Sequence, residues 1–173
     1  MATKKTSMFT LTERITMSAA ATDTLATIDL GSYVDVGDRQ ALQVHSVDFI
    51  FQGATAASDM VADIGNGKEF NVQLTDLNRG GLVFANDRAL VASGRLTIDA
   101  NGGLDRDADL YPDNFGKGSD DGRFVVNDQL YLTANVTGLV NTANVTVRVN
   151  ASIVSLSAKD FMAIAIQSTA ADN

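Results

Sequence analysis

Apolar and polar residues alternate along most of this chain, and this alternation is the feature that most limits the folds open to it. In the segment MFTLTERITM, the apolar residues Phe9, Leu11, Ile15 and Met17 all fall on odd-numbered positions, so they share one parity. Successive side chains of a β-strand point to opposite faces, so a period of two predicts a strand buried on one face. The alternation therefore favours an antiparallel sheet.

The same pattern predicts further strands, separated by short segments rich in Gly, Asp and Asn, which are turn residues. The predicted segments are Leu25–Leu30, Tyr33–Val36, Gln40–Gln52, Phe70–Leu74, Leu82–Phe84, Leu90–Ala92, Leu96–Ile98, Phe124–Val126, Leu130–Val136 and Val145–Leu156. About eight to ten strands with turns between them predict an all-β fold, an antiparallel β-sandwich of the jelly-roll or Greek-key kind.

One long predicted strand, Gln40–Gln52, changes its inward parity partway along. Leu42 and Val44 share one parity, whereas Val47 and Phe49 share the other, so the change falls at His45. An extra residue in one strand of a pair restores the facing of the residues beyond it. We therefore predict a β-bulge near His45.

The C-terminal part of the chain carries a second change of parity and a possible helix. In the last predicted strand the parity changes again at Val154. Beyond it, Ser157 and Asp160 have the spacing of a helix capping box, and Phe161 and Ile164 share one helical face. The sequence allows a short C-terminal helix here, and a buried terminal strand also fits.

Length and composition indicate one domain, residues 8–173, preceded by a short arm, residues 1–7. The chain has 173 residues, of which 45% are hydrophobic, enough for one core. It contains no cysteine, which excludes disulfides, zinc–thiolate sites and cysteine nucleophiles. The longest apolar run, Phe161–Ile166, is far shorter than the ~20 residues of a membrane helix, and the N-terminal segment lacks the apolar core of a Sec-type signal peptide.

The charge of the chain bears on its partners. A net charge of −8 disfavours strong nucleic-acid binding, because neutralising phosphates requires a dense basic surface. Lys4 and Lys5 form a small basic arm within MATKKTS. That segment has too little apolar surface to order itself, so we expect neighbouring subunits to hold it. Lys4 and Lys5 are thus candidate assembly residues.

The segment Asp99–Arg123 concentrates seven aspartates and five glycines. Asp105, Asp107 and Asp109 have the spacing that opens an EF-hand loop. However, Leu110 stands where the EF-hand needs glycine, and Gly116 stands where it needs a bidentate glutamate. The EF-hand prediction therefore fails.

Two interpretations of this acidic segment remain. Calcium needs only six to eight oxygens in a loose cage, so Asp105, Asp107, Asp109 and Asp113 are candidate ligands of a noncanonical calcium site. Alternatively, the segment is a long surface loop that contacts a neighbour, since long loops in compact domains are usually functional or make contacts. We favour the contact loop, with no cofactor.

No catalytic constellation stands out in the sequence. His45 is the only histidine, and it falls inside a predicted strand beside a parity change, which favours a structural role. Aspartates are so numerous that pairs of carboxylates occur in any fold and diagnose nothing. We therefore expect a protein that is not an enzyme.

A one-domain, strand-rich chain with a basic arm at Lys4 and Lys5, long acidic loops and no catalytic constellation resembles the viral single jelly-roll capsid proteins. The resemblance spans the chain and is architectural. It implies a self-assembling subunit of an icosahedral shell whose partners are copies of itself and other capsid proteins, located in a virion assembled in the host cytoplasm. The weakly basic arm implies no direct genome binding.

Three alternatives belong to other classes. A calcium-dependent glycan-binding β-sandwich would use the acidic segment for metal and Tyr111 and Phe115 for stacking on sugar, although the chain lacks tryptophan, the favoured stacking residue. An extracellular filament subunit would need head-to-tail contacts that do not close. A hydrolase would show a deep polar pocket, whereas a shell subunit would show flat, extended contact faces.

Overall fold

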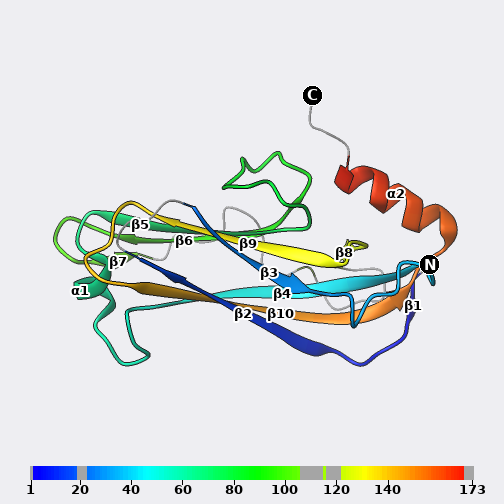
Figure 1. The fold of residues 1–173 in the computed structure, drawn as a ribbon, viewed down its shortest axis with the longest axis horizontal. Helices are drawn as coiled ribbons and strands as arrows, with labels where there is room; N and C mark the ends of the chain where they lie inside the picture. Colours follow the sequence, from blue (N-terminus) through cyan, green and yellow to red (C-terminus); the bar gives the residue numbers. More distant parts are fainter. Residues whose placement is uncertain (1, 19–22, 106–114, 116–121, 170–173) are drawn as a thin grey trace.

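The computed structural model describes residues 2–18, 23–105, 115 and 122–169, and this part of the chain forms ten strands and two helices (Figure 1). The strands are β1 (Thr3–Lys4), β2 (Phe9–Met17), β3 (Thr24–Asp29), β4 (Gln40–Gln52), β5 (Lys68–Thr75), β6 (Leu90–Ile98), β7 (Leu104–Asp105), β8 (Arg123–Val125), β9 (Gln129–Val136) and β10 (Ala143–Ser155). The helices are α1 (Met60–Ile64) and α2 (Ala158–Thr169). Neither helix has the length and apolar character needed to span a membrane in the described residues.

The strands form two antiparallel sheets that pack face to face. One sheet, called here the β10 sheet, has the order β2-β10-β4-β8, with β1 beside β2 on the same edge of β10. The other, the β9 sheet, has the order β3-β9-β5-β6-β7. The pairs β5·β6, β4·β8, β3·β9 and β2·β10 are nested one inside the next along the chain. A long hairpin rolled up in this way is a jelly roll, so the predicted all-β sandwich is confirmed.

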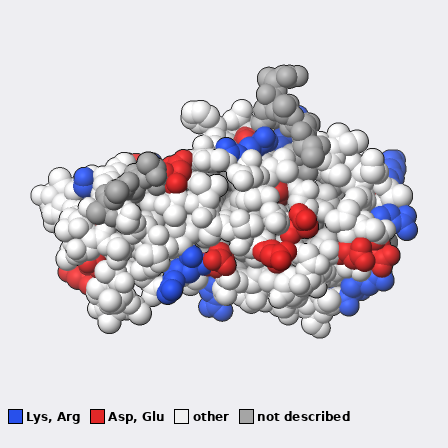
Figure 2. All heavy atoms as spheres, viewed as in Figure 1, with Lys and Arg blue, Asp and Glu red and all other residues white. Residues whose placement is uncertain are grey.

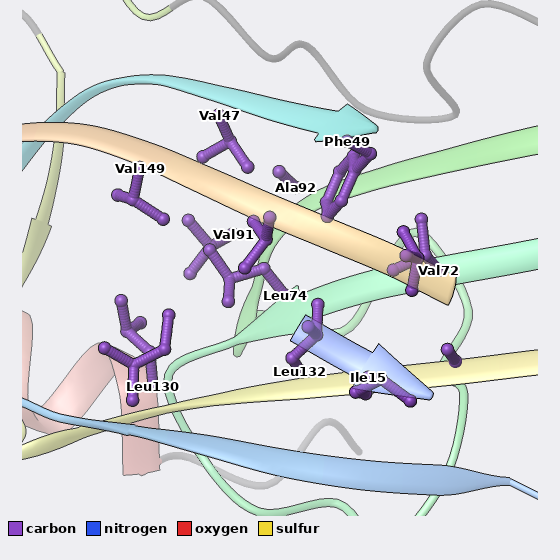
Figure 3. Close-up of a cluster of buried hydrophobic side chains, with 14 of the residues drawn as sticks. Ile15, Val47, Phe49, Val72, Leu74, Val91, Ala92, Leu130, Leu132 and Val149 are labelled. Carbon is purple, nitrogen blue, oxygen red and sulfur yellow. The ribbon is translucent and has the colours of Figure 1, made fainter. Parts of the chain in front are cut away.

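The main hydrophobic core fills the space between the sheets (Figure 3). The β10 sheet contributes residues such as Ile15, Val47 and Val149, and the β9 sheet contributes Leu74 and Leu132. These residues lie on the alternate positions that the period of two predicts, because each strand turns one face toward the other sheet.

The predicted β-bulge at His45 is confirmed. In the pairing of β4 with β10, Asn150 lies opposite Ser46 and Ala151 lies opposite Val44, which leaves His45 as an extra residue without a pairing partner. This one extra residue changes which alternate positions of β4 face inward, so the apolar residues on both sides of it point into the same core.

The second parity change, at Val154, has a different cause. The pairing of β10 with β4 stays regular through Val154, so there is no bulge at this point. Instead, Val154 lies on the outer face of the β10 sheet, in a smaller apolar cluster with Ala41 and Leu156 that is covered by Phe161 and Ile164 of α2. Both faces of the strand end are therefore covered by protein.

The C-terminal segment is the helix α2, not a terminal strand. The Ser157 hydroxyl accepts a hydrogen bond from the Asp160 amide at 3.2 Å and donates to the Asp160 carboxylate at 2.8 Å. This is a capping interaction of the kind that the sequence predicts, and it fixes the start of the helix.

Four predicted strand segments differ from the structure. Leu90–Ala92 and Leu96–Ile98 belong to the single strand β6. Tyr33–Val36 is no strand, because the amides of Tyr33 and Val34 both donate to the Leu30 carbonyl at 2.8 Å and close a turn. Leu82–Phe84 also lies in a loop, for a reason given below.

A glycine in the core allows the two sheets to approach closely. A Cβ atom added to Gly94 of β6 would lie 3.0 Å from the ring of Phe49 on β4. Larger side chains in a packed core force neighbours out of place at a typical cost of about 1–3 kcal/mol. We therefore expect Gly94→Val to lower the free energy of unfolding in urea by about 1–3 kcal/mol.

The matched control is Gly94→Val combined with Phe49→Leu, which shortens the side chain that the new methyl groups meet. Residues in contact are not independent, so the double variant should lose less stability than the sum of the two single variants. Additive losses would contradict this account of Gly94.

Candidate functional site

The acidic segment is described at its two ends and at Phe115. Of the four candidate calcium ligands, Asp105 is the last residue of β7, and Asp107, Asp109 and Asp113 lie outside the described residues. Among the side chains that the structure describes, no three His, Asp or Glu residues come together in a way that could hold a metal ion. The calcium site thus stays a prediction.

The first aspartate of this segment has a structural role. One Asp99 carboxylate oxygen accepts hydrogen bonds from the amides of Asn101 at 2.6 Å and Gly103 at 2.9 Å. Backbone hydrogen bonds from Gly103 and Asn101 lower the pKa of Asp99, because they stabilise the charged form. Asp99 therefore closes its own turn before β7.

His45 occupies the bulge of β4. Its Nε2 atom lies 2.9 Å from the Ser152 hydroxyl of β10, and its carbonyl accepts the Phe115 amide at 2.9 Å. Its Nδ1 atom is buried and has no hydrogen-bond partner in the described structure. A catalytic histidine needs a carboxylate or carbonyl at that atom to orient the ring. The contacts of His45 are those of a residue that fixes a bulge.

The basic arm pairs with its own chain. Thr3 and Lys4 lie opposite Ser155 and Val154 of β10, and the Lys5 amide donates to the Ile153 carbonyl at 2.8 Å. The expectation that this segment needs a neighbouring subunit to order it is therefore wrong, because the backbone of β10 holds it. The side chains of Lys4 and Lys5 remain exposed and available for contacts.

Asp63 organises the loops at the α1 end of the sandwich. Its carboxylate accepts the Ala54 amide at 2.6 Å and the Asn141 side chain at 2.9 Å, and its carbonyl accepts the Val140 amide at 3.0 Å. Hydrogen bonds from Ser58, Ala54 and Asn141 lower the pKa of this buried carboxyl. Asp63 thus joins α1 to the two connections beside it.

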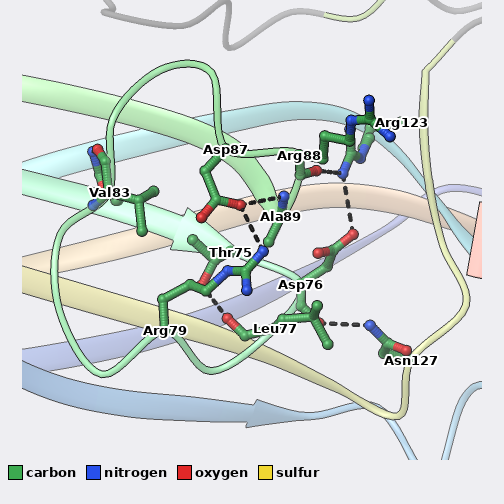
Figure 4. Close-up of polar contacts among 11 residues, drawn as sticks. Thr75, Asp76, Leu77, Arg79, Val83, Asp87, Arg88, Ala89, Arg123 and Asn127 are labelled. Carbon is green, nitrogen blue, oxygen red and sulfur yellow. Dashed lines mark hydrogen bonds and ion pairs between the residues drawn. The ribbon is translucent and has the colours of Figure 1, made fainter. Parts of the chain in front are cut away.

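The connection between β5 and β6, residues 76–89, is held in place by side chains along its length (Figure 4). We call it the 76–89 loop. The side-chain amide of Gln73 donates to the Val83 carbonyl at 2.8 Å and accepts the Val83 amide at 2.7 Å. This occupies both backbone groups of Val83, so Leu82–Phe84 cannot join a strand ladder. Arg79 and Asp87 add an ion pair of 2.9 Å across the loop.

Asp76 anchors the base of the same loop. Its carboxylate lies 3.1 Å from the Arg123 guanidinium of β8, which also donates to the Arg88 carbonyl (Figure 4). The Asn127 side chain donates to the Asp76 carbonyl at 2.6 Å, and the Asp76 amide donates to the Ala89 carbonyl at 2.9 Å. This network ties the 76–89 loop to β8 and to the start of β9.

The environment of Asp76 is unusual for a carboxylate. The residue is 1% exposed, and its second oxygen, Oδ1, is buried with no hydrogen-bond partner in the described structure. Burial raises the pKa of Asp76, because it penalises the charged form, and the Arg123 guanidinium opposes this rise without cancelling it. No local pattern in the sequence predicts this pair, because its members are 47 residues apart.

Several large apolar side chains are exposed to solvent, among them one in the 76–89 loop and two on α2. Phe84, in the 76–89 loop, is 87% exposed. On α2, Met162 is 57% exposed and Ile166 is 61% exposed, and these two residues lie one turn apart on the same face. The sequence contains a signal that Phe84 lies in a loop, because the pair Gly80-Gly81, which is typical of turns, stands shortly before it.

A cavity of about 190 Å³ lies between β8 and α2. Its lining residues are Asp76, Gly122, Arg123, Phe124, Ile164 and Gln167. We call it the α2 cavity. Phe124 and Ile164 make part of the wall apolar, while Arg123 and Gln167 provide polar groups at its surface.

The charged residues of the face in Figure 2 lie in small separate groups among uncharged ones. Basic and acidic groups alternate across this face rather than forming one continuous patch.

The comparisons with known proteins found no family model, no curated relative and no solved structure that matches this chain.

The Asp76–Arg123 pair gives a prediction about stability. Arg123→Met keeps a long side chain and removes its charge, which leaves a buried carboxylate without its ion partner. Removing one partner of a buried pair typically costs about 3–5 kcal/mol. Because Arg123 is itself partly exposed, we expect a loss of about 3 kcal/mol at pH 7, measured by urea unfolding.

The pH dependence provides the control. Since the pKa of Asp76 is raised by folding, the protonated form stabilises the fold below the pKa of the unfolded chain, and that contribution is lost as pH rises through the folded pKa. The penalty of Arg123→Met should therefore shrink on acidification, whereas Arg123→Met with Asp76→Asn should show a penalty that changes little with pH. A penalty of equal size at every pH in the single variant would show that Asp76 is not the cause.

Proposed function

We propose that this chain is a structural subunit that assembles with copies of itself into a closed shell, most specifically the capsid of an icosahedral virus. The observation that carries the proposal is a jelly roll that holds Phe84, Met162 and Ile166 out in solvent on ordered elements. Jelly rolls occur in viral capsid and lectin domains. Exposed apolar groups on such a frame suit contacts between proteins.

The outer face of the β10 sheet supports the same proposal, because it is broad, regular and polar. Thr10 of β2 donates to Asn150 of β10 at 2.7 Å, and Asn150 donates to Ser46 of β4 at 2.9 Å. The side chains thus bond to one another across three strands. A polar face of this kind suits a hydrated contact between subunits.

Closed assembly does not require strong single contacts. Most soluble oligomers are symmetric, and repeated weak contacts act together once several of them form at the same time. A small domain with contact residues on a loop and a terminal helix is suited to this kind of assembly. The proposal assigns no chemical turnover to the chain.

The glycan-binding alternative loses one of its two stacking residues. Phe115 is partly buried and packs against the main core, so its ring is engaged within the domain. Its partner in that hypothesis, Tyr111, lies outside the described residues. The filament alternative shares the assembly logic and differs only in whether the contacts close.

The first test is the mass distribution of the purified protein, measured by light scattering and negative-stain imaging with and without a calcium chelator. We expect closed particles of uniform size that survive chelation. Open filaments would favour the filament alternative. A strict monomer under both conditions, at all protein concentrations reached, would contradict the proposal.

The acidic segment has a matched variant for this test. A chain with Asp105, Asp107, Asp109 and Asp113 all changed to Asn keeps the size of these side chains and removes the charge that calcium needs. On our interpretation of the segment as a contact loop, this variant should form particles with the same response to chelator as the parent chain. Particles that need calcium in the parent and fail to form in the variant would establish the metal site instead.

The basic arm gives a second assembly prediction. Lys4→Ser with Lys5→Ser removes two exposed charges that form no ion pair in the described structure. We expect unchanged unfolding in urea, because exposed charges contribute about 0–1 kcal/mol to stability. If the lysines contact acidic groups of neighbours, the concentration needed for assembly should rise about 5-fold, the equivalent of ~1 kcal/mol. Lys68→Ser, at the other end of the sandwich, is the control, and an equal effect there would exclude a specific role for the arm.

A further inference from the structure

The backbone at Phe84 is fixed by hydrogen bonds, although its side chain lies in solvent. The residue before it, Val83, has both backbone groups bonded to Gln73, and the Phe84 carbonyl accepts the Asp87 amide at 3.0 Å. Because the backbone is already fixed, burial of the ring by a partner costs side-chain rotamer entropy but little backbone entropy. A projecting aromatic side chain on a fixed backbone is suited to act as an interface hot spot.

The α2 cavity has the size and the lining to receive an aromatic ring. A cavity of about 150 Å³ with apolar walls takes up benzene, and the α2 cavity measures about 190 Å³. Phe124 and Ile164 offer apolar contacts, and Arg123 lines the same space. A cation beside the face of an aromatic ring adds a favourable electrostatic contact.

The 76–89 loop and α2 project toward the same side of the sandwich (Figure 1). The two elements are also connected, because Asp76 at the base of the loop lines the α2 cavity. A projecting ring and a cavity on one side of a molecule allow two copies related by a two-fold axis to exchange the same contact twice.

The charge of this region suits a contact between two copies. Residues 76–89, 122–125 and 158–167 contain four basic and three acidic side chains, while the whole chain carries −8. Two copies of an acidic chain repel each other least where the local charge is close to balanced. This side of the molecule is therefore favoured for self-association.

We propose that Phe84 of one copy inserts into the α2 cavity of a second copy, and that the second copy returns the same contact. The proposal rests on the assembly function proposed above and names one of its contacts. Met162 and Ile166 lie on the exposed face of α2, the helix whose Ile164 and Gln167 line the cavity. The occupant is a second copy of this chain.

Cross-linking tests the geometry directly, because the chain has no cysteine of its own. Ala85→Cys places a thiol beside Phe84 without removing the ring, and Gln167→Cys places one at the wall of the cavity. Mixed single-cysteine variants treated with a short thiol cross-linker should give a product that joins residues 85 and 167 of different copies. The double variant should give mainly covalent dimers if the contact is two-fold, whereas a ladder of larger products would overturn the two-fold arrangement.

Substitutions test the energetics. Phe84→Ser removes the ring, and Gln167→Trp fills the cavity from its own wall. Each should weaken the contact by about 30-fold or more, as expected for a hot spot. An equimolar mixture of the two variants should recover part of the association, because one retains the cavity and the other retains the ring. Val140→Ser is the control, since Val140 is 62% exposed and lies beside α1.

The outcomes separate this proposal from the assembly function. If the parent chain assembles and both variants assemble equally well, the contact proposed here is wrong and the assembly function stands. If only Phe84→Ser fails to associate, Phe84 docks elsewhere, and the cavity assignment is wrong. If the parent chain is a monomer at all concentrations, both proposals are wrong. Circular dichroism of each variant verifies that it is folded.

Discussion

The pairing of β4 with β10 is the interaction on which the rest of this fold depends. Each of these strands has 13 residues, and together they form the centre of the β10 sheet, with β2 and β1 on one side and β8 on the other. The bulge at His45 lets the pair stay in register while the apolar residues on both sides of it point into the core, namely Leu42, Val44, Val47 and Phe49. A shift of one residue without the bulge would turn half of these side chains to solvent.

Local patterns in the sequence predicted what depends on neighbouring residues. Alternation predicted most of the strands, the parity change predicted the bulge at His45, and the spacing of Ser157 and Asp160 predicted a helix cap. The prediction failed where a distant side chain took the place of a strand partner. Leu82–Phe84 is apolar like a strand, yet Gln73 bonds both backbone groups of Val83, and no local pattern shows that contact.

The Asp76–Arg123 pair and the α2 cavity are formed by residues that are still farther apart along the chain. Arg123 reaches Asp76 only because the nested pairing brings β8 to the end of β5, and the α2 cavity forms only because α2 then packs beside β8. An alternating sequence predicts that strands exist but not which ones become neighbours, since that depends on the whole topology. The exposed position of Phe84 follows from the same network.

The acidic composition of the chain has a structural explanation in the described residues. Asp29, Asp35, Asp59 and Asp99 each accept a hydrogen bond from the amide two residues further along. The short aspartate side chain is suited to this geometry, which explains why the chain uses aspartate far more than glutamate. Much of the negative charge therefore accompanies the turns that join the strands. The self-association that we propose would then use regions where charges are balanced, and the side that carries the 76–89 loop and α2 is such a region.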